Sequence, residues 1–389
     1  MSASRPNLRR RPARSRVLVA VASVVMALVL VGAGVADRVA NGGSGTPGPA
    51  ATASGSSDGG RPPPSGGAGG GAHRARVPTA RADRASRAAT TTTTTPPTAP
   101  VAGPGRPSLG IYTGGGNVAG AEQLAAGLPL PYALDYLPGN SWQSIADPAW
   151  TLARWQGSHF SMIWGVPMLP ATGGTLADGA AGDYDPAFYA LGQQLVAAGQ
   201  ADAILMIGYD PTETANPWAV TTAGEAGQYV EYWRQIVTAL RSVPGAAFRF
   251  EWDVAAGPAV VSPAALYPGN AYVDIVATDA FDIPSPAAAG SGWSAQAAIP
   301  DGPDWLASFA ARHGKELMIA KWGLVPKAAG GQGDDAAFVG RFLTWCAEHQ
   351  VVAAVLWDDG TWALTGGGFP AADAAFATLE QSGGHPAGP

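Results

Sequence analysis

The sequence has little of the residue types that carry redox, metal or nucleotide chemistry. Its 389 residues include one cysteine, Cys346, so no disulfide can form within the chain. The five histidines show none of the spacings that bind a metal ion, and we expect neither a metal nor a cofactor. No GxGxxG pattern follows the first strand-like run, which disfavours a dinucleotide-binding sheet.

Charged residues are also scarce, at 13% of the chain, and they are unevenly divided. Residues 1–107 contain 14 arginines and 3 aspartates, a balance of +11, whereas the remainder holds 9 basic and 26 acidic residues, a balance of −17. An acidic domain of that size repels phosphate backbones, so we expect no nucleic-acid partner.

The amino terminus has the pattern of a membrane anchor or signal peptide. Five arginines between residues 9 and 16 precede an apolar run over residues 17–31, and small residues extend this run to Ala36. About 20 residues suffice to span a bilayer. The arginines predict that residues 1–36 begin in the cytoplasm and that the rest of the chain lies outside, as a single-pass membrane protein. Cleavage after Ala36 would instead give a secreted protein.

Residues 37–107 are dense in Gly, Pro, Ser, Ala and Thr, with a threonine run at 90–95. This composition lacks the apolar content that offsets the entropy of ordering. We therefore predict a disordered linker between the anchor and a domain over residues 108–389.

From Ser108 onward, eight short apolar runs alternate with helix-like segments. The runs cover residues 109–112, 132–136, 160–167, 204–208, 247–252, 273–279, 317–321 and 351–357. Apolar residues recur at helical spacing in 188–198, 229–240, 304–311, 336–348 and 372–379. This alternation predicts an α/β fold, a single (β/α)8 TIM barrel, with a doubly wound open sheet as the alternative. Residues 114–116, all glycine, are interpreted as a strand-to-helix turn.

Active sites of such barrels lie at the carboxyl ends of the strands. Here those ends are rich in acids and aromatic residues. The candidates for binding are Tyr209, Trp218, Trp252, Phe281, Trp322 and Trp357. Indole rings stack on the apolar faces of sugars, and carboxylates accept hydrogen bonds from hydroxyls, so a neutral polysaccharide is the expected partner. The alternative is that these tryptophans only fill the space between barrel and helices.

Several motifs resemble glycoside hydrolase family 26, the endo-β-mannanases, in its actinobacterial branch. Residues 206–218 (MIGYDPTETANPW) align without a gap with the family pattern RxGWEFNGxWYPW. Further matches are GDYD at 182–185, YPGN at 267–270, DAFD at 279–282 and AKWG at 320–323, the last corresponding to the family's SEWG or SEFG. The resemblance covers most of residues 108–379 and implies a (β/α)8 barrel with a mannan-type or glucan-type β-linked substrate.

The chain departs from the family at the residues that carry the chemistry. The resemblance places Asp210 at the glutamate acid/base and Lys321 at the glutamate nucleophile, with Met206 and Thr212 replacing the flanking Arg and Asn. A retaining mechanism needs two carboxyl groups about 5–5.5 Å apart. We expect Lys321 to pair with Asp210, which leaves that acid ionised and a poor proton donor.

Three functional hypotheses follow. The first is a monomeric, membrane-tethered barrel that binds a β-linked glycan with weak or no hydrolysis. The second is an active glycosidase in which Glu213, Glu251 or Asp279 has taken over a catalytic role. The third is a non-catalytic interaction scaffold, because a fold does not determine an activity.

Overall fold

The computed structural model describes residues 107–290 and 292–381. The predicted anchor and nearly all of the predicted linker lie outside these ranges. Within them, no helix is both long and apolar enough to cross a membrane.

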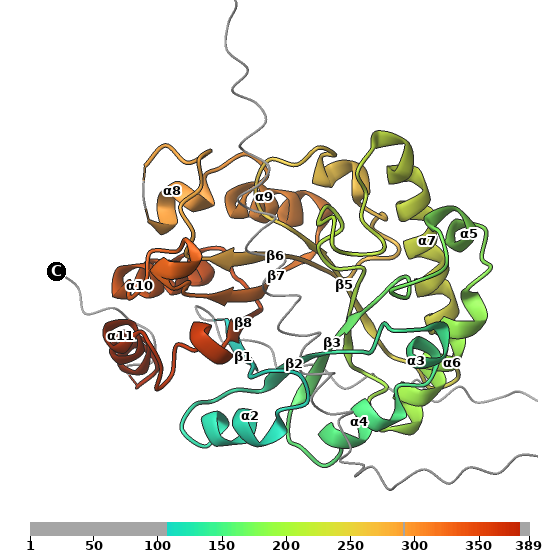
Figure 1. Ribbon diagram of the computed structural model, residues 1–389, viewed down its shortest axis with the longest axis horizontal. Helices are drawn as coiled ribbons and strands as arrows, with labels where there is room; N and C mark the ends of the chain where they lie inside the picture. The colour runs from blue at the N-terminus through green and yellow to red at the C-terminus, as the bar shows by residue number, and fades with distance from the viewer. Residues whose placement is uncertain (1–106, 291, 382–389) are drawn as a thin grey trace, which may run out of the picture. The chain divides into compact units, whose positions relative to one another are not determined.

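Eight parallel strands form a closed barrel in sequence order, β1 to β8, with β8 paired to β1 (Figure 1). The strands are β1 (Ser108–Tyr112), β2 (Tyr132–Tyr136), β3 (Ser161–Val166), β4 (Ile204–Ile207), β5 (Arg249–Val254), β6 (Ile275–Phe281), β7 (Glu316–Gly323) and β8 (Ala353–Trp357). The predicted TIM-barrel architecture is thereby confirmed for the described residues.

Helices surround the strands, as Figure 1 shows. They are α2 (Val118–Ala125), α3 (Trp142–Ala146), α4 (Ala149–Trp155), α5 (Leu176–Ala180), α6 (Asp185–Ala197), α7 (Ala223–Arg241), α8 (Trp293–Ala297), α9 (Pro303–His313), α10 (Ala336–Glu348) and α11 (Pro370–Gln381), with short 3-10 turns η1 (Pro263–Leu266), η2 (Lys327–Ala329) and η3 (Gly360–Trp362). All five helices predicted from periodicity are present, and the glycine turn at 114–116 leads into α2.

Helix α10 illustrates why these segments are helical. Asp335 caps its first turn by accepting a hydrogen bond from the backbone N–H of Phe338 at 3.0 Å. Phe338, Phe342 and Trp345 then recur at helical spacing and are buried against the rest of the barrel. One polar cap and one apolar face therefore fix both the start and the orientation of the helix.

Alternation along β5 decides which side chains enter the barrel. Phe250 packs against Trp233 of α7, and Trp252 packs against Phe309 of α9, so both point outward. Successive side chains of a strand point to opposite faces, which turns Glu251 and Asp253 inward. The interior of the barrel at β5 is therefore acidic.

A β-bulge in β7 sets the direction of Lys321. Ile319 pairs with Thr278 of β6, but Lys321, two residues later, pairs with the next residue, Asp279. Ala320 is the extra residue, and such an insertion re-aims the side chains that follow it. Lys321 consequently points inward beside Asp279, while Trp322 points outward toward α10 and α11.

Candidate functional site

The ammonium group of Lys321 lies among three carboxylates inside the carboxyl end of the barrel. Its Nζ donates hydrogen bonds to Oδ2 of Asp210 at 2.9 Å and to Oδ2 of Asp253 at 3.3 Å. Oδ2 of Asp279 lies 3.1 Å from the same nitrogen, as an ion pair whose angles do not satisfy a hydrogen bond. The loop after β4 and the strands β5, β6 and β7 thus each bring one ionisable group to a common point, and we call these four residues the Lys321 cluster.

Every member of the Lys321 cluster is buried, with Lys321 itself 1% exposed. Burial alone would lower the pKa of Lys321, but the carboxylates of Asp210, Asp253 and Asp279 outweigh it and raise that pKa well above its usual value. Burial also raises the pKa of Asp253 to about 6 and that of Asp279 well above its ordinary range, although Lys321 opposes both shifts. These shifts favour the charged form of Lys321 and the neutral forms of Asp253 and Asp279.

Asp210 is held in an unusual backbone conformation by the loop that follows it. Its φ is +48°, in the left-handed region that aspartate tolerates better than most residues. The side chain of Asn216 donates to the carbonyl oxygens of Tyr209 and Asp210, both at 3.1 Å, and the indole N–H of Trp218 donates to that of Tyr209 at 2.9 Å. The segment 206–218 thus holds the backbone of Asp210 by hydrogen bonds, with the side chain of Asp210 directed toward Lys321.

Glu213 lies on the same loop, closer to solvent. Its backbone N–H donates to the carbonyl of Asp210 at 3.0 Å, and its side chain is half-buried. Burial and the negative charge of Asp210 raise the pKa of Glu213 to about 7. Among the predicted catalytic candidates, Glu213 is the one with both access to solvent and a pKa suited to proton transfer near neutral pH.

Glu251 is one inward position below Asp253 on β5. It is 0% exposed, and neither carboxyl oxygen has a hydrogen-bond partner. Burial and the nearby carboxyl of Asp253 raise the pKa of Glu251 well above its ordinary value, which favours the neutral form of this carboxyl. The structure places Glu251 inside the barrel beneath the mouth rather than on a surface that a polymer can reach.

Aromatic rings surround the Lys321 cluster at the carboxyl end of the barrel. The ring of Tyr209 lies 5.8 Å from Lys321 Nζ and meets Trp218 edge-on at 5.0 Å. On the opposite side, Trp357 contacts both Tyr112, at 4.0 Å between ring centroids, and Phe281, at 6.4 Å. The structure therefore brings Tyr209, Trp218, Phe281 and Trp357 to the predicted end of the barrel, all largely buried.

Trp252 and Trp322 lie elsewhere, which corrects their placement among the mouth residues. Trp252 packs at 5.6 Å against Phe309 of α9. Trp322 stacks at 4.7 Å on Phe342 of α10 and meets Phe376 of α11. Both side chains are 0% exposed and fill the space between barrel and helices. The alternative interpretation of the tryptophans holds for these two residues.

Two site residues were absent from the sequence-based candidates. Asp253 bonds Lys321 directly, and Tyr136 meets Tyr209 edge-on at 5.1 Å. The signal for Asp253 was available, because it shares strand parity with Glu251. The ring of Tyr136 lies across Gly165 of β3, where no side chain could be accommodated. This contact depends on neighbouring strands and leaves no local signal.

The chemical capacity of the Lys321 cluster follows from its geometry. The ammonium of Lys321 fills the space between Asp210 and Asp279, so neither carboxylate is free to attack an anomeric carbon. Within residues 107–290 and 292–381, no three His, Cys, Asp or Glu side chains are arranged to hold a metal ion.

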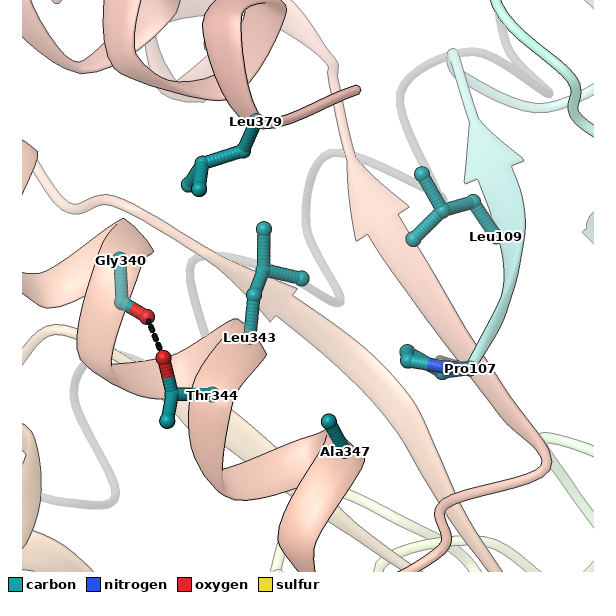
Figure 2. Close-up of a pocket in the computed structure, with 7 residues that line it drawn as sticks. All are labelled: Pro107, Leu109, Gly340, Leu343, Thr344, Ala347 and Leu379. Atoms are coloured by element: carbon teal, nitrogen blue, oxygen red, sulfur yellow. Dashed lines mark hydrogen bonds between the residues drawn. The ribbon is translucent and has the colours of Figure 1, made fainter. Parts of the chain in front are cut away.

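A hollow lies between the start of β1, α10 and α11 (Figure 2). Its lining residues are Pro107, Leu109, Gly340, Leu343, Thr344, Ala347 and Leu379. The hydroxyl of Thr344 donates a hydrogen bond to the carbonyl oxygen of Gly340 at 2.9 Å. The lining carries no titratable side chain, so this hollow offers no catalytic chemistry.

Solved structures share the barrel. A mannanase from Bacillus subtilis, BCman, matches with a TM-score of 0.50 and 14% identity over 72% of this chain and 86% of its own. The GH26C protein of a Muricauda species matches with a TM-score of 0.51 and 12% identity over 71% and 86%. The catalytic domain of a GH26 endo-β-1,4-mannanase from a Bacillus species gives 0.49, with 16% identity over 71% and 86%.

No protein-family model matches this sequence. A search of curated proteins also finds no match. The first two structural matches therefore establish a shared fold, the eight-stranded barrel, and nothing more specific.

Proposed function

We propose that this chain is a barrel of the family 26 type, in the actinobacterial branch, that binds a β-linked polysaccharide of the mannan kind and hydrolyses it slowly or not at all. The observation that carries the proposal is the position of Lys321, 2.9 Å from Asp210 and 3.1 Å from Asp279. An ammonium at that point repels the oxocarbenium-like charge that develops during glycoside hydrolysis. The shared fold with the Bacillus subtilis mannanase BCman supports the choice of glycan.

Binding would use the aromatic rings at the carboxyl end of the barrel. Tyr209 and Trp218 on one side, with Phe281 and Trp357 on the other, offer the apolar surfaces on which pyranose rings stack. Because these rings are largely buried, a glycan would gain contact through small movements of the surrounding loops. Glu213 at the rim supplies an acceptor for sugar hydroxyls.

The proposal includes a location. Residues 1–36 would anchor the chain in the cell membrane, with the linker over residues 37–107 and the barrel outside, or they would be removed after Ala36 to release the barrel. A protein held at the cell surface would bind polymers that cannot enter the cell. Protease added to intact cells should release a barrel-sized fragment; full-length protein in the cytoplasm would contradict this location.

A second candidate function is hydrolysis by a rearranged carboxyl group. Glu213 favours it, because its pKa of about 7 and its partial exposure suit a general acid. In that case Glu213→Gln should abolish a measurable activity while leaving binding intact. In a protein that only binds, the same substitution should leave glycan retention nearly unchanged, because the amide oxygen of glutamine still accepts hydrogen bonds from sugar hydroxyls.

The experiment that tests the proposal exposes the full-length protein to a panel of insoluble β-mannans and β-glucans. Retention on one polymer without release of reducing ends is the expected result. Rapid release of reducing ends would favour the second candidate. Absence of retention on every polymer would instead favour a non-catalytic scaffold that contacts other proteins.

A further inference from the structure

The interior of the barrel carries ionisable groups from one end to the other. Arg249, Glu251 and Asp253 occupy three successive inward positions on β5. Barrels of this kind are usually filled with layers of branched aliphatic side chains. Asp253 belongs to the Lys321 cluster at the carboxyl end, whereas Arg249 pairs with Glu316 at the opposite end.

Glu251 is the middle group and has no partner among the described protein atoms. Both of its oxygens are inaccessible and unpaired. One further oxygen, Oδ1, is unpaired on each of Asp210, Asp253 and Asp279. A buried polar group without a hydrogen bond costs about 1–3 kcal/mol of stability. Several unpaired carboxyl oxygens in one place therefore imply a hydrogen-bond partner that is not a protein atom.

The spacing between these groups suits a water molecule. Inward positions on a strand are about 7 Å apart, too far for most direct hydrogen bonds between short side chains. Ala277 and Ala353, which share the inward face, have small side chains, whereas Met206 and Ile275, which pair with Glu251, are larger. Lys321 and Arg249 lie on either side of Glu251, and this positive charge favours neutral water over a cation.

We propose that the barrel axis holds internal water between Arg249 and the Lys321 cluster, and that Glu251 is the central group of a proton path along it. About two water molecules are enough, because each internal water makes about three hydrogen bonds. Glu251 passes its own proton through water to Asp253 and regains one from water that is supplied by bulk solvent, so that in each transfer one O–H bond breaks as another forms. The path opens at the end of the barrel opposite the proposed glycan site.

This inference goes beyond the proposed function and holds whether or not a glycan binds. Its consequence is that the Lys321 cluster can exchange protons with solvent at the end of the barrel opposite the proposed glycan site. Glu316 is exposed and Arg249 partly exposed, so the lower end of the path reaches solvent.

Magnetic relaxation dispersion of water, which counts long-lived internal water molecules, tests the water site in the full-length protein. The wild type and Glu251→Gln should show such a contribution, whereas Glu251→Leu should lose it. Met206→Leu, an apolar change at the inward position that pairs with Glu251, is the control and should retain it. Equal signals from the wild type and Glu251→Leu, or no signal from the wild type, would overturn the site.

Infrared spectroscopy tests the path separately and does not depend on the leucine variant folding. After transfer to heavy water, the band of the remaining protonated carboxyl should shift more slowly in Glu251→Gln than in the wild type, because the amide cannot relay a proton. Equal exchange rates in the two proteins would overturn the path.

Discussion

At the scale of single residues, the protein is distinguished by where it places one ammonium group. Lys321 is 1% exposed and surrounded by the carboxylates of Asp210, Asp253 and Asp279. Removal of one partner from a buried ion pair is strongly destabilising, because the remaining charges are left without compensation. Lys321 is therefore a structural centre of the barrel, and under the proposed function it also blocks catalysis.

Lys321→Met should lower the free energy of unfolding by about 3–5 kcal/mol at pH 7. The loss should be smaller at pH 5, because the carboxyls of Asp253 and Asp279, whose pKa values are raised by burial, can take up protons once Lys321 is gone. Urea titrations at the two pH values measure this. Lys327→Met, at an exposed lysine of η2, is the control and should change little. An equal loss at both pH values would argue against this electrostatic role.

Substitutions of two tryptophans distinguish a residue that only packs the fold from one that binds the glycan. Trp322→Ala should cost about 3–5 kcal/mol of stability, since it empties the space between β7, α10 and α11. The affinity of the folded variant for a retained glycan should not change. Trp218→Ala should lower affinity by about 1–3 kcal/mol, because it removes both an aromatic surface and the brace on Tyr209. Calorimetric titration measures the affinity for the glycan, and thermal unfolding measures the stability. If Trp322→Ala lowered affinity while Trp218→Ala lowered only stability, Trp322 would be the binding residue and Trp218 the packing residue.

At the scale of elements, most of the fold could be predicted from the alternation of short apolar runs with helix-like segments. The apolar runs gave the eight strands, and helical spacing gave α6, α7, α9, α10 and α11. The helices α3, α5 and α8 have five residues each and leave too short a pattern to be detected. The direction of Trp322 was missed because Ala320 forms a bulge, which depends on the pairing of β7 with both neighbours.

The loop before α10 also caps the first turn of α11. Asp334, just before α10, accepts hydrogen bonds from the backbone N–H groups of Ala371 at 3.0 Å and Ala372 at 2.8 Å. Asp334→Ala should destabilise the barrel by about 0.5–2 kcal/mol, as loss of a helix cap does. Chemical unfolding measures the effect, with Glu348→Ala at the exposed end of α10 as the control. No difference between the two variants would show that α11 does not need this cap.

At the scale of the whole molecule, raised carboxyl pKa values link stability to pH. Burial raises the pKa of Glu251 and Asp279 well above the ordinary range and those of Glu213 and Asp282 to about 7. The folded state thus binds more protons than the unfolded state above pH 4. Stability should fall as pH rises from 5 to 7, by about 1.4 kcal/mol per pH unit for each additional proton held.

Thermal unfolding at several pH values measures this dependence in a single buffer series of constant ionic strength. The midpoint should be higher at pH 5 than at pH 7. Glu251→Gln should flatten the curve, because it removes one titrating group without changing its size. A midpoint that rises with pH would mean that the buried carboxyls are ionised in the folded protein.

The central claim is that the barrel retains a β-linked glycan while Lys321 prevents cleavage. The most direct test compares the full-length wild type with the double variant Asp210→Glu, Lys321→Glu, which places glutamates at the two positions that resemble the catalytic positions of family 26. Release of reducing ends from a β-mannan that both proteins bind should be higher for the double variant, with retained anomeric configuration and a modest rate, since Met206 and Thr212 are unchanged. Measurable hydrolysis by the wild type that the double variant abolishes would contradict the account, because Asp210 and Lys321 would then be the working residues.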